Sequence, residues 1–314
     1  MDSNPLSVLV TGSSGFIGSH VVRHLHAAGH RVTALDYIPP KDALPEGVAF
    51  HVCDIRQSLL PNQCFDAVVH LAALAGVRPS IHDPIGYEFT NVIGTIRLLD
   101  FCRRMEVPTF ILASSSSVYG PDTPLPARED SQANPCSPYA LTKLHGEQWG
   151  RLYARMHGLR FLALRFFSVW GPGQRPDLAL ENFRRRIEAG QPVIIHGDGT
   201  RRRDLTHVAD VARAVGLALR WRGTGAVVLN VGTGKNHSVM DMVDAATKAA
   251  AGKSNDIHPA PVHQESHPAD VPETLASLER VGRELGWEPT VFFPDAPVVA
   301  ETGNLEQRPD KFSW

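Results

Sequence analysis

The stretch Thr11-Gly12-Ser13-Ser14-Gly15-Phe16-Ile17-Gly18 decides the fold. It follows a short apolar run, Ser7–Thr11, that predicts a strand, and it opens an amphipathic segment, Phe16–Ala28, that predicts a helix. Glycines at such a junction are typical of a turn that binds the pyrophosphate of a dinucleotide. The alternative, an accidental glycine turn, leaves the two flanking elements unexplained.

Each glycine has its own physical role. Gly12 permits a tight turn, Gly15 lets the backbone approach a pyrophosphate, and Gly18 allows the helix to pack closely on the strand. Phe16 and Ile17 open the helix, whose free N–H groups and partial positive charge attract the pyrophosphate. We therefore expect all five residues to bind the cofactor.

Two aspartates at the ends of later strands indicate which dinucleotide is bound. Asp36 stands 18 residues after Gly18, where a carboxylate accepts the ribose hydroxyls and repels a 2′-phosphate, which favours NAD over NADP. Asp54, with Ile55 beside it, could accept a hydrogen bond from the adenine amino group. The alternatives are a solvated loop aspartate at 36 and a turn-forming aspartate at 54.

The first half of the chain alternates between predicted strands and helices. After Ser7–Thr11, the predicted strands are Arg31–Leu35, Val48–Val52, Ala67–Leu71, Thr109–Ala113 and Arg160–Phe166. The predicted helices after the first are Ile85–Met105 and Pro138–His157. This alternation is typical of parallel βαβ units. We expect an α/β Rossmann fold, a doubly wound parallel sheet whose strand ends meet at one ligand-binding edge.

The pattern becomes irregular after Phe166. There we predict a helix around Arg184–Arg186, a strand at Val193–Ile195, a helix capped by Thr206 and ending at Trp221, a strand at Ala226–Val231, and helices at Ser238–Ala251 and Thr274–Leu285. We therefore divide the chain into an NAD-binding Rossmann domain, 1–166 with 204–233 returning to it, and a smaller C-terminal α/β substrate lobe, 167–203 and 234–314.

The composition is that of an ordinary soluble protein, with 43% hydrophobic and 20% charged residues among 314. The net charge of −2 predicts no binding to nucleic acid or to an anionic membrane. The four cysteines fit neither a zinc site nor a disulfide framework, and the histidines lack metal-ligand spacing, so we expect no metal and a reduced, cytoplasmic protein. The longest apolar stretch, Val68 to Val77, is too short to span a bilayer, and the first ten residues lack the features of a signal peptide.

Tyr139 and Lys143 stand four residues apart, on one face of a predicted helix. A free tyrosine has a pKa near 10, but a nearby ammonium and a positive nicotinamide stabilise the phenolate and lower that pKa. Tyr139 could then take a proton from a sugar hydroxyl while a hydride leaves the same carbon. Taken alone, such a pair is more often part of an amphipathic helix surface.

A run of serines, residues 114–117, follows the predicted strand Thr109–Ala113 and precedes Val118-Tyr119-Gly120. Serine runs are often loop filler. At the carboxyl end of a parallel strand, however, their hydroxyls point into the crevice that we expect Tyr139 to face. We expect one of them to hydrogen-bond the reacting oxygen.

Together these motifs resemble the extended short-chain dehydrogenase/reductases, and among them the UDP-sugar 4-epimerases, from about Val8 to Leu285. The other shared motifs are His70-Leu71-Ala72-Ala73, Asn91, Leu164 to Pro172, Gly197-Asp198-Gly199 and Arg203-Asp204. The resemblance implies that Tyr139 is the base, that Lys143 orients it and holds the nicotinamide ribose, and that Ser115 is the third catalytic residue, with Ser116 as the fallback. It also implies a homodimer through helices 85–105 and 138–157, and further NAD contacts from Leu71, Ala72, Ala73, Asn91 and Phe166.

The residues after Ser115 indicate the reaction. Oxidation at C4 of a UDP-sugar gives a transient 4-keto sugar. Related dehydratases carry an Asp-Glu pair directly after the catalytic hydroxyl, and related decarboxylases carry a glutamate at the position of Ser117, whereas this chain has Ser116 and Ser117. We expect the keto sugar to rotate and take the hydride back on its other face, which is 4-epimerisation with NAD regenerated.

The segment Gly173-Gln174-Arg175-Pro176-Asp177 resembles that of UDP-glucuronate 4-epimerases in particular. Arg175 could clamp a C6 carboxylate through a bidentate pair, and Arg78 is a second candidate. Ser168 replaces the asparagine common in UDP-galactose epimerases. The predicted reaction is therefore the conversion of UDP-glucuronate to UDP-galacturonate.

The resemblance also assigns residues to the rest of the UDP-sugar, and alternatives stay open. The further expected substrate contacts are Ser115, Ser116, Ser117, Val193, Arg203 at the diphosphate, and Asp270 at the uridine ribose. Arg175 and Arg203 could instead be solvated surface cations. The alternative functions are a UDP-glucose/UDP-galactose or N-acetylhexosamine 4-epimerase, a UDP-glucuronate decarboxylase, and a non-catalytic NAD-binding sensor.

Overall fold

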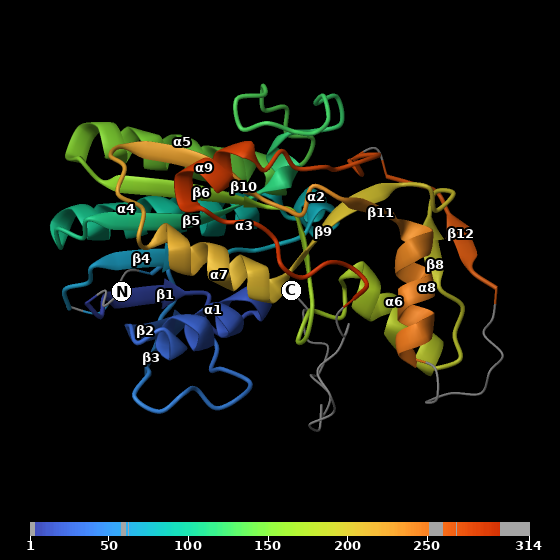
Figure 1. The fold of residues 1–314 in the computed structure, drawn as a ribbon, viewed down its shortest axis with the longest axis horizontal. Helices are drawn as coiled ribbons and strands as arrows, with labels where there is room; N and C mark the ends of the chain where they lie inside the picture. The colour runs from blue at the N-terminus through green and yellow to red at the C-terminus, as the bar shows by residue number, and fades with distance from the viewer. Residues whose placement is uncertain (1–3, 58–60, 62, 251–259, 268, 296–314) are drawn as a thin grey trace.

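A parallel sheet of seven strands forms the centre of the computed structural model, which describes residues 4–57, 61, 63–250, 260–267 and 269–295 (Figure 1). Its order is β10-β6-β5-β4-β1-β2-β3. The strands are β1 (Ser7–Thr11), β2 (Arg31–Asp36), β3 (Ala49–Val52), β4 (Ala67–His70), β5 (Thr109–Ser115), β6 (Arg160–Phe166) and β10 (Ala226–Val231). The predicted doubly wound Rossmann fold is confirmed. The strand order reverses at β1, between β2 and β4, so a ligand crevice is expected above its carboxyl end.

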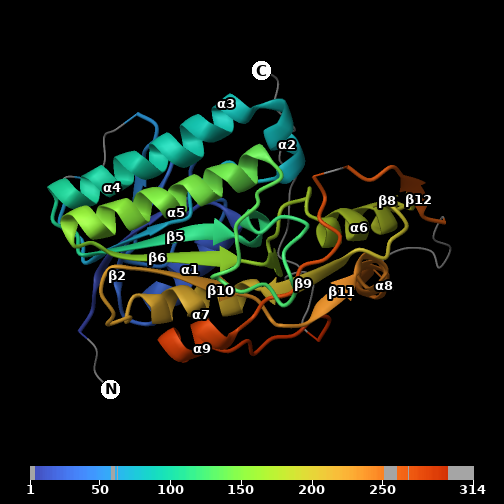
Figure 2. The ribbon, with the colours of Figure 1, turned by 90° about the horizontal axis from the view of Figure 1, so that it is seen from above.

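Helices cover both faces of this sheet because alternate side chains of each strand point to opposite sides (Figure 2). In β1, Val8 and Val10 join the core under α1 (Phe16–Ala27) and α7 (Val208–Ala218). Leu9, between them, joins the core under α4 (Gly94–Arg104) and α5 (Pro138–His157). The two separate cores hold the crevice residues on a rigid frame.

The predicted helix Ile85–Met105 is helical but not uniform. It divides into α3 (Pro84–Tyr87), a wider π-helical segment η1 (Glu88–Ile93), and α4, and a short helix α2 (Val77–His82) precedes it. Asp83 begins this helix by accepting a hydrogen bond from the Gly86 amide at 2.9 Å. Single π-helical turns inside α-helices are frequent at functional sites, and η1 contains Asn91.

A smaller lobe lies at one end of the sheet, and the sequence predicted it only in part (Figure 1). Its helices are α6 (Ala179–Glu188) and α8 (Val239–Ala250). Its strands are β7 (Ser168–Trp170), β8 (Ile194–His196), β9 (Arg202–His207), β11 (Asn236–Ser238) and β12 (Val262–Gln264). Four of these strands, all except β8, were not predicted, because three- to six-residue strands carry little periodicity of their own.

Three predicted helix boundaries are wrong, the first being the end of α7, which falls at Ala218 rather than at Trp221. Thr206 lies inside β9, and it is His207 that caps α7, with Nδ1 accepting from the Ala209 amide at 3.3 Å. The segment from Thr274 is not helical until α9 (Glu279–Leu285), because the Thr274 amide donates to the Arg202 carbonyl at 3.2 Å. Pairing with a distant strand thus overrides the local helical pattern.

Helix α9 packs against β10 and α7, with Val281 and nearby Trp287 buried in the core beneath α1. The sequence analysis placed all of residues 234–314 in the substrate lobe. In the structure, however, α9 packs against the Rossmann sheet. The division into two domains otherwise stays a prediction. Residues 251–259, 268 and 296–314 of that lobe lie outside the described residues.

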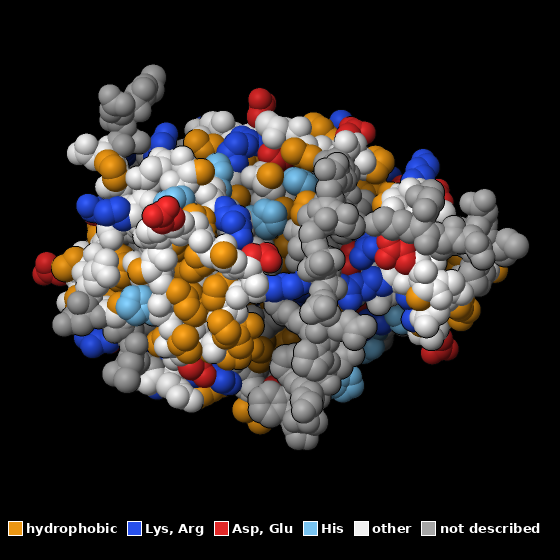
Figure 3. All heavy atoms as spheres, turned by 90° about the horizontal axis from the view of Figure 1, so that it is seen from below, with side chains coloured by type: hydrophobic (Ala, Val, Ile, Leu, Met, Phe, Trp, Pro, Cys, Tyr) orange, Lys and Arg blue, Asp and Glu red, His pale blue; other side chains and the backbone are white. Residues whose placement is uncertain are grey.

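Charged side chains of both signs are interspersed on the face shown in Figure 3, and hydrophobic side chains gather near its middle. This distribution agrees with the net charge of −2. Among the helices that the structure describes, none is long and apolar enough to cross a membrane.

Candidate functional site

The glycine turn between β1 and α1 leaves room for nothing larger than hydrogen. A Cβ on Gly12 would lie 2.5 Å from the Ala72 amide nitrogen, and a Cβ on Gly18 would lie 2.0 Å from the Gly12 carbonyl oxygen. Gly12 also has a φ of 71°, which favours glycine. Gly15 precedes α1 without a side-chain cap, so the first N–H groups of α1, from Phe16 and Ile17 on, face the crevice. This arrangement fits a dinucleotide pyrophosphate.

The two predicted adenosine-side aspartates differ in their surroundings. Asp36, at the end of β2, is buried and accepts a hydrogen bond from the Ser14 amide at 3.0 Å. Burial raises the pKa of the Asp36 carboxyl, although backbone amide donors act in the opposite direction. Asp54 instead holds Arg56 at 2.7 Å, and this hydrogen-bonded pair lowers the pKa of Asp54. Asp54 therefore already has a partner, and its contact with adenine stays a prediction, as does that of neighbouring Ile55.

Tyr139, Lys143 and Ser115 come together at the carboxyl end of β5. The Lys143 Nζ lies 5.7 Å from the centroid of the Tyr139 ring and donates to the Ala113 carbonyl at 2.8 Å. Burial raises the pKa of the Tyr139 phenol, whereas a hydrogen bond with Ser115 lowers it. Burial lowers the pKa of Lys143 to about 8. The three predicted residues thus lie together, with Ser115 rather than the fallback Ser116 acting on the Tyr139 phenol, and their catalytic roles stay a prediction.

The serines after Ser115 form a tight turn. The Ser115 hydroxyl accepts from the Ser117 amide at 3.1 Å and donates to the Ser117 hydroxyl at 3.0 Å. Ser116 begins the one-turn helix η2 (Ser116–Val118). Both Ser116 and Ser117 therefore lie next to Ser115, and their sugar contacts stay predictions.

A buried hydrogen-bond network ties the loop after β4 to the helix that carries Tyr139. The Asn91 side chain accepts from the Leu74 amide at 2.8 Å and donates to the Thr142 hydroxyl at 3.0 Å. The Thr142 hydroxyl in turn donates to the Tyr139 carbonyl at 2.8 Å. On the β1 side of the same loop, Thr11 accepts from the Leu71 amide at 3.1 Å and from the Ala72 amide at 3.4 Å, and the NAD contacts of Leu71, Ala72, Ala73 and Asn91 stay predictions. The sequence named Asn91 but missed Thr142, which no motif singles out.

The positive charge of Arg175 acts on Tyr139, the candidate base. Its guanidinium makes a bidentate pair with Asp177, at 2.9 and 2.7 Å, and its positive charge lowers the pKa of Tyr139. The ring of Tyr87 meets the Tyr139 ring edge to face at 6.4 Å. Ser168, the first residue of β7, lies in the strand just before this loop. The sequence predicted Arg175 but not that Asp177 would occupy one edge of its guanidinium.

Three arginines surround Asp270. The Arg78 Nη2 donates to the Asp270 carboxylate at 2.7 Å, and the Arg201 Nη1 donates to the Asp270 carbonyl at 3.0 Å. Burial lowers the pKa of Arg203, whereas the Asp270 charge raises it. Three cations around one carboxylate leave an excess of positive charge, which suits a diphosphate. Arg201 was missed as a candidate, because it stands in a run that also reads as a solvated surface.

Arg78 uses both of its terminal nitrogens in this cluster, because Nη2 bonds Asp270 and Nη1 contacts His196 Nε2 at 2.7 Å. We therefore group Arg78 with Arg201 and Arg203 at the expected diphosphate, rather than with Arg175. Phe166 is buried in the core under α1 and α7, and Val193 is buried in the core of the smaller lobe. The Val193 carbonyl accepts from the Val262 amide at 2.8 Å. The structure thus assigns both residues to packing, and their ligand contacts stay predictions.

A Rossmann sheet with a tyrosine–lysine pair on the helix after β5 and a serine at the end of β5 defines the extended short-chain dehydrogenase/reductase class. The chain matches the NAD dependent epimerase/dehydratase family over residues 8–232, and it belongs to that family. The predicted resemblance is confirmed.

Individual relatives cover almost the whole chain. A UDP-glucuronate 4-epimerase of Thermodesulfobacterium geofontis is 33% identical over 303 residues, covering 90% of this chain and 91% of the relative. The structure of MoeE5 in complex with UDP-glucuronic acid and NAD is 38% identical, with a TM-score of 0.82 and coverage of 91% and 94%. The UDP-glucuronic acid 4-epimerase from Bacillus cereus, in complex with UDP-glucuronic acid and NAD, is 32% identical, with a TM-score of 0.82 and coverage of 91% and 95%.

Proposed function

We propose that this protein is an NAD-dependent enzyme that converts UDP-glucuronate to UDP-galacturonate by epimerisation at C4. The observation that carries the choice of sugar is the position of Arg175, whose positive charge acts on the phenol of Tyr139. A hexuronate with its C4 hydroxyl at Tyr139 would bring its C6 carboxylate near that guanidinium. The relatives that are named for UDP-glucuronate, or are bound to it, support the same sugar.

Each residue of the proposed site has its own role in the reaction. Tyr139 takes the proton of the C4 hydroxyl, while the ammonium of Lys143 and the hydroxyl of Ser115 stabilise the phenolate. Gly12, Gly15 and Gly18 hold NAD, which supplies, when bound, a reversible acceptor for the hydrogen and electron pair of C4. After the 4-keto sugar has rotated to present its other face, the hydride would return to C4 on that face, and Tyr139 gives the proton back to the C4 oxygen.

The serines next to Ser115 support epimerisation over the other fates of a 4-keto sugar. Ser116 and Ser117 offer hydroxyls where dehydration would need a carboxylic acid and a carboxylate. A 4-keto hexuronate is a β-keto acid that loses CO₂ when its carboxylate stands perpendicular to the ring. A bidentate contact from the free edge of Arg175 would hold the carboxylate away from that geometry.

The test separates the sugar from the reaction. The purified protein is incubated with UDP-glucuronate, UDP-glucose and UDP-N-acetylglucosamine in turn, and the products are identified by mass and NMR. Arg175→Ala should raise the KM for UDP-glucuronate roughly tenfold or more, since a charge-assisted pair contributes about 1.5–3 kcal/mol. Arg103→Ala, which removes an exposed arginine paired with Asp100, is the matched control.

Three results would contradict this proposal. A 4-epimer formed only from a neutral sugar would make the protein a UDP-glucose/UDP-galactose or N-acetylhexosamine 4-epimerase. A UDP-pentose from the wild-type protein would make it a decarboxylase. Unchanged turnover and affinity for UDP-glucuronate in Arg175→Ala would remove Arg175 from carboxylate binding.

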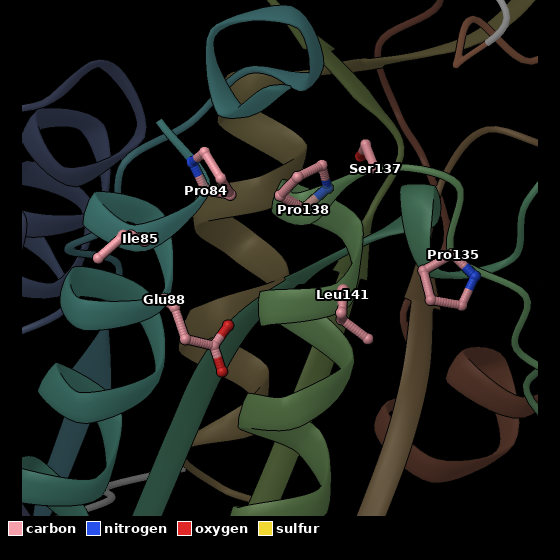
Figure 4. Close-up of a pocket in the computed structure, with 7 residues that line it drawn as sticks. All are labelled: Pro84, Ile85, Glu88, Pro135, Ser137, Pro138 and Leu141. Carbon is pink, nitrogen blue, oxygen red and sulfur yellow. The ribbon is translucent and has the colours of Figure 1, made fainter. Parts of the chain in front are cut away.

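We also propose a cytoplasmic homodimer. Ile85, Phe89 and Leu141 are large hydrophobic residues that are 80%, 48% and 41% exposed, on the neighbouring elements α3, η1 and α5. Ile85 and Leu141 line a mostly apolar groove together with Pro84, Pro135 and Pro138 (Figure 4). A second copy that packs the same helices there would remove this apolar surface from water. No disulfide joins the four cysteines, all of which lie in the described part of the chain, and this is compatible with a reduced compartment.

A further inference from the structure

Helix α5 carries a third polar residue in line with the catalytic pair. Tyr139, Lys143 and Glu147 are spaced by four residues, so they lie on one face of the helix, one turn apart. Each of them reaches a consecutive residue of β5. Lys143 donates to the Ala113 carbonyl at 2.8 Å and Glu147 accepts from the Ser114 hydroxyl at 2.5 Å, while the Ser115 side chain acts on the Tyr139 phenol.

The Glu147 contact is buried and anchored on its far side. Glu147 is 0% exposed and Ser114 is 3% exposed. The carboxylate also accepts a bidentate pair from Arg165 of β6, with Nε at 2.9 Å and Nη2 at 2.8 Å. Removing Glu147 would leave the buried charge of Arg165 without its partner, at a high cost in stability. Arg165 of β6 therefore fixes the position of the Glu147 carboxylate, and this carboxylate in turn fixes Ser114 of β5.

The residues after Ser115 are anchored to the same arginine. The Arg165 guanidinium lies 4.6 Å from the centroid of the Tyr119 ring, and the Tyr119 hydroxyl donates to Asn230 of β10 at 2.6 Å. Ser115 thus lies between two fixed points, Ser114 on one side and Tyr119 on the other. If β5 moved relative to its neighbours, it would lose the Ser114–Glu147 bond before Ser115 and strain the Tyr119 contacts after it.

We propose that Glu147 is a positioning residue for the reaction, acting through Ser114 to hold the Ser115 hydroxyl in register with the Tyr139 phenol. This inference rests on the proposed function insofar as Tyr139 is the base, but it does not depend on which sugar is bound. A misplacement of about 1 Å in such a pair costs on the order of a hundredfold in rate.

The experiment removes the link and leaves the ion pair intact. Ser114→Ala should lower kcat roughly 10- to 100-fold and leave the substrate KM and the NAD affinity within about twofold. Ser114→Thr, which keeps a hydroxyl, should recover most of the activity. Thr290→Val is the matched control, because it removes a hydroxyl that donates to the Asp210 carboxylate at 2.7 Å, away from α5 and β5.

A pH profile distinguishes positioning from a general loss of structure. The groups that face the Tyr139 phenol are Lys143, Ser115, Arg175 and Tyr87. Loosening the Ser115 hydrogen bond removes an effect that lowers the Tyr139 pKa, so the acid limb of kcat should move to higher pH in Ser114→Ala. Partial unfolding would instead scale the whole profile without moving that limb.

The outcomes are separable. An unchanged kcat and acid limb in Ser114→Ala, or a fall in kcat that matches Thr290→Val with the limb unmoved, would overturn the positioning role. If Tyr139→Phe leaves turnover intact, Tyr139 is not the base, and the mechanism given under the proposed function is wrong. If Tyr139→Phe abolishes turnover while Ser114→Ala does not, only the role of Glu147 fails.

Discussion

His70, at the end of β4, lies inside the protein between two threonine hydroxyls. Its Nδ1 meets the Thr11 hydroxyl at 2.8 Å and its Nε2 meets the Thr95 hydroxyl at 3.0 Å. Burial, assisted by the charge of Lys143, lowers the pKa of His70 to about 3. The ring is therefore neutral in the folded protein at every pH at which the enzyme would work, and its role is to join β1, β4 and α4.

This burial predicts a pH dependence of stability. The unfolded chain protonates His70 near pH 6.5 and the folded chain does not, so the unfolded state binds more protons and stability falls as pH drops from about 6.5 toward 3. The contribution is about 1.4 kcal/mol per pH unit. We expect the free energy of unfolding of His70→Gln, measured by urea titration between pH 7.5 and 4.5, to fall less steeply than that of the wild type. Parallel curves would contradict the neutral buried state.

Single residues also show where prediction from sequence stops. Tyr139, Lys143 and Ser115 could be predicted because their spacing and their place after a strand reflect the chemistry directly. The partners of Asp54 and Arg175 could not be predicted, although Arg56 and Asp177 stand only two residues away. Whether such a pair closes depends on rotamers and on neighbouring loops, which leave no periodic signal in the sequence.

Among the elements, those with local start and stop signals were predicted best. Helix α5 begins and ends as predicted because Ser137 caps it, Pro138 occupies its first turn, and Gly158 ends it with a φ of 70°. The extended segment after Pro272 was predicted as helix because its partners, β9 and Ala127, are far away in the sequence. Glu147 was missed for the same reason, since its two partners come from separate strands.

The junction of β1 and α1 provides a prediction at this scale. A Cβ on Gly18 would meet the Gly12 carbonyl oxygen at 2.0 Å, so Gly18→Ala must push α1 away from the turn, at a cost of about 1–3 kcal/mol. We expect its Kd for NAD, measured by calorimetric titration, to rise roughly tenfold or more. Gly282→Ala is the control, because Gly282 lies in α9, has no positive φ, and a Cβ there would meet only the Trp287 carbonyl oxygen at an ordinary 3.9 Å. Equal NAD affinities in the two variants would argue against the tight turn.

At the scale of the whole molecule, the sheet brings residues from distant parts of the sequence to one edge. The parallel order could be predicted because each βαβ unit repeats the same pattern, whereas the small lobe consists of short strands that pair across long separations. The Arg78–Asp270 contact shows the consequence. It joins α2 to a segment 192 residues later, and it places the diphosphate candidates between the sheet and the lobe.

The apolar groove between α3 and α5 predicts how whole molecules associate. Leu141 is 41% exposed there, and an arginine at this position would put a charge in the centre of the proposed contact between two copies. We expect sedimentation equilibrium to show a dimer for the wild type and a monomer for Leu141→Arg at micromolar concentration. Val52→Arg, which changes a 70% exposed residue on the edge strand β3, should remain a dimer. Because Leu141 lies within a turn of Tyr139, turnover is measured alongside, and a dimeric Leu141→Arg protein would place the contact on another surface.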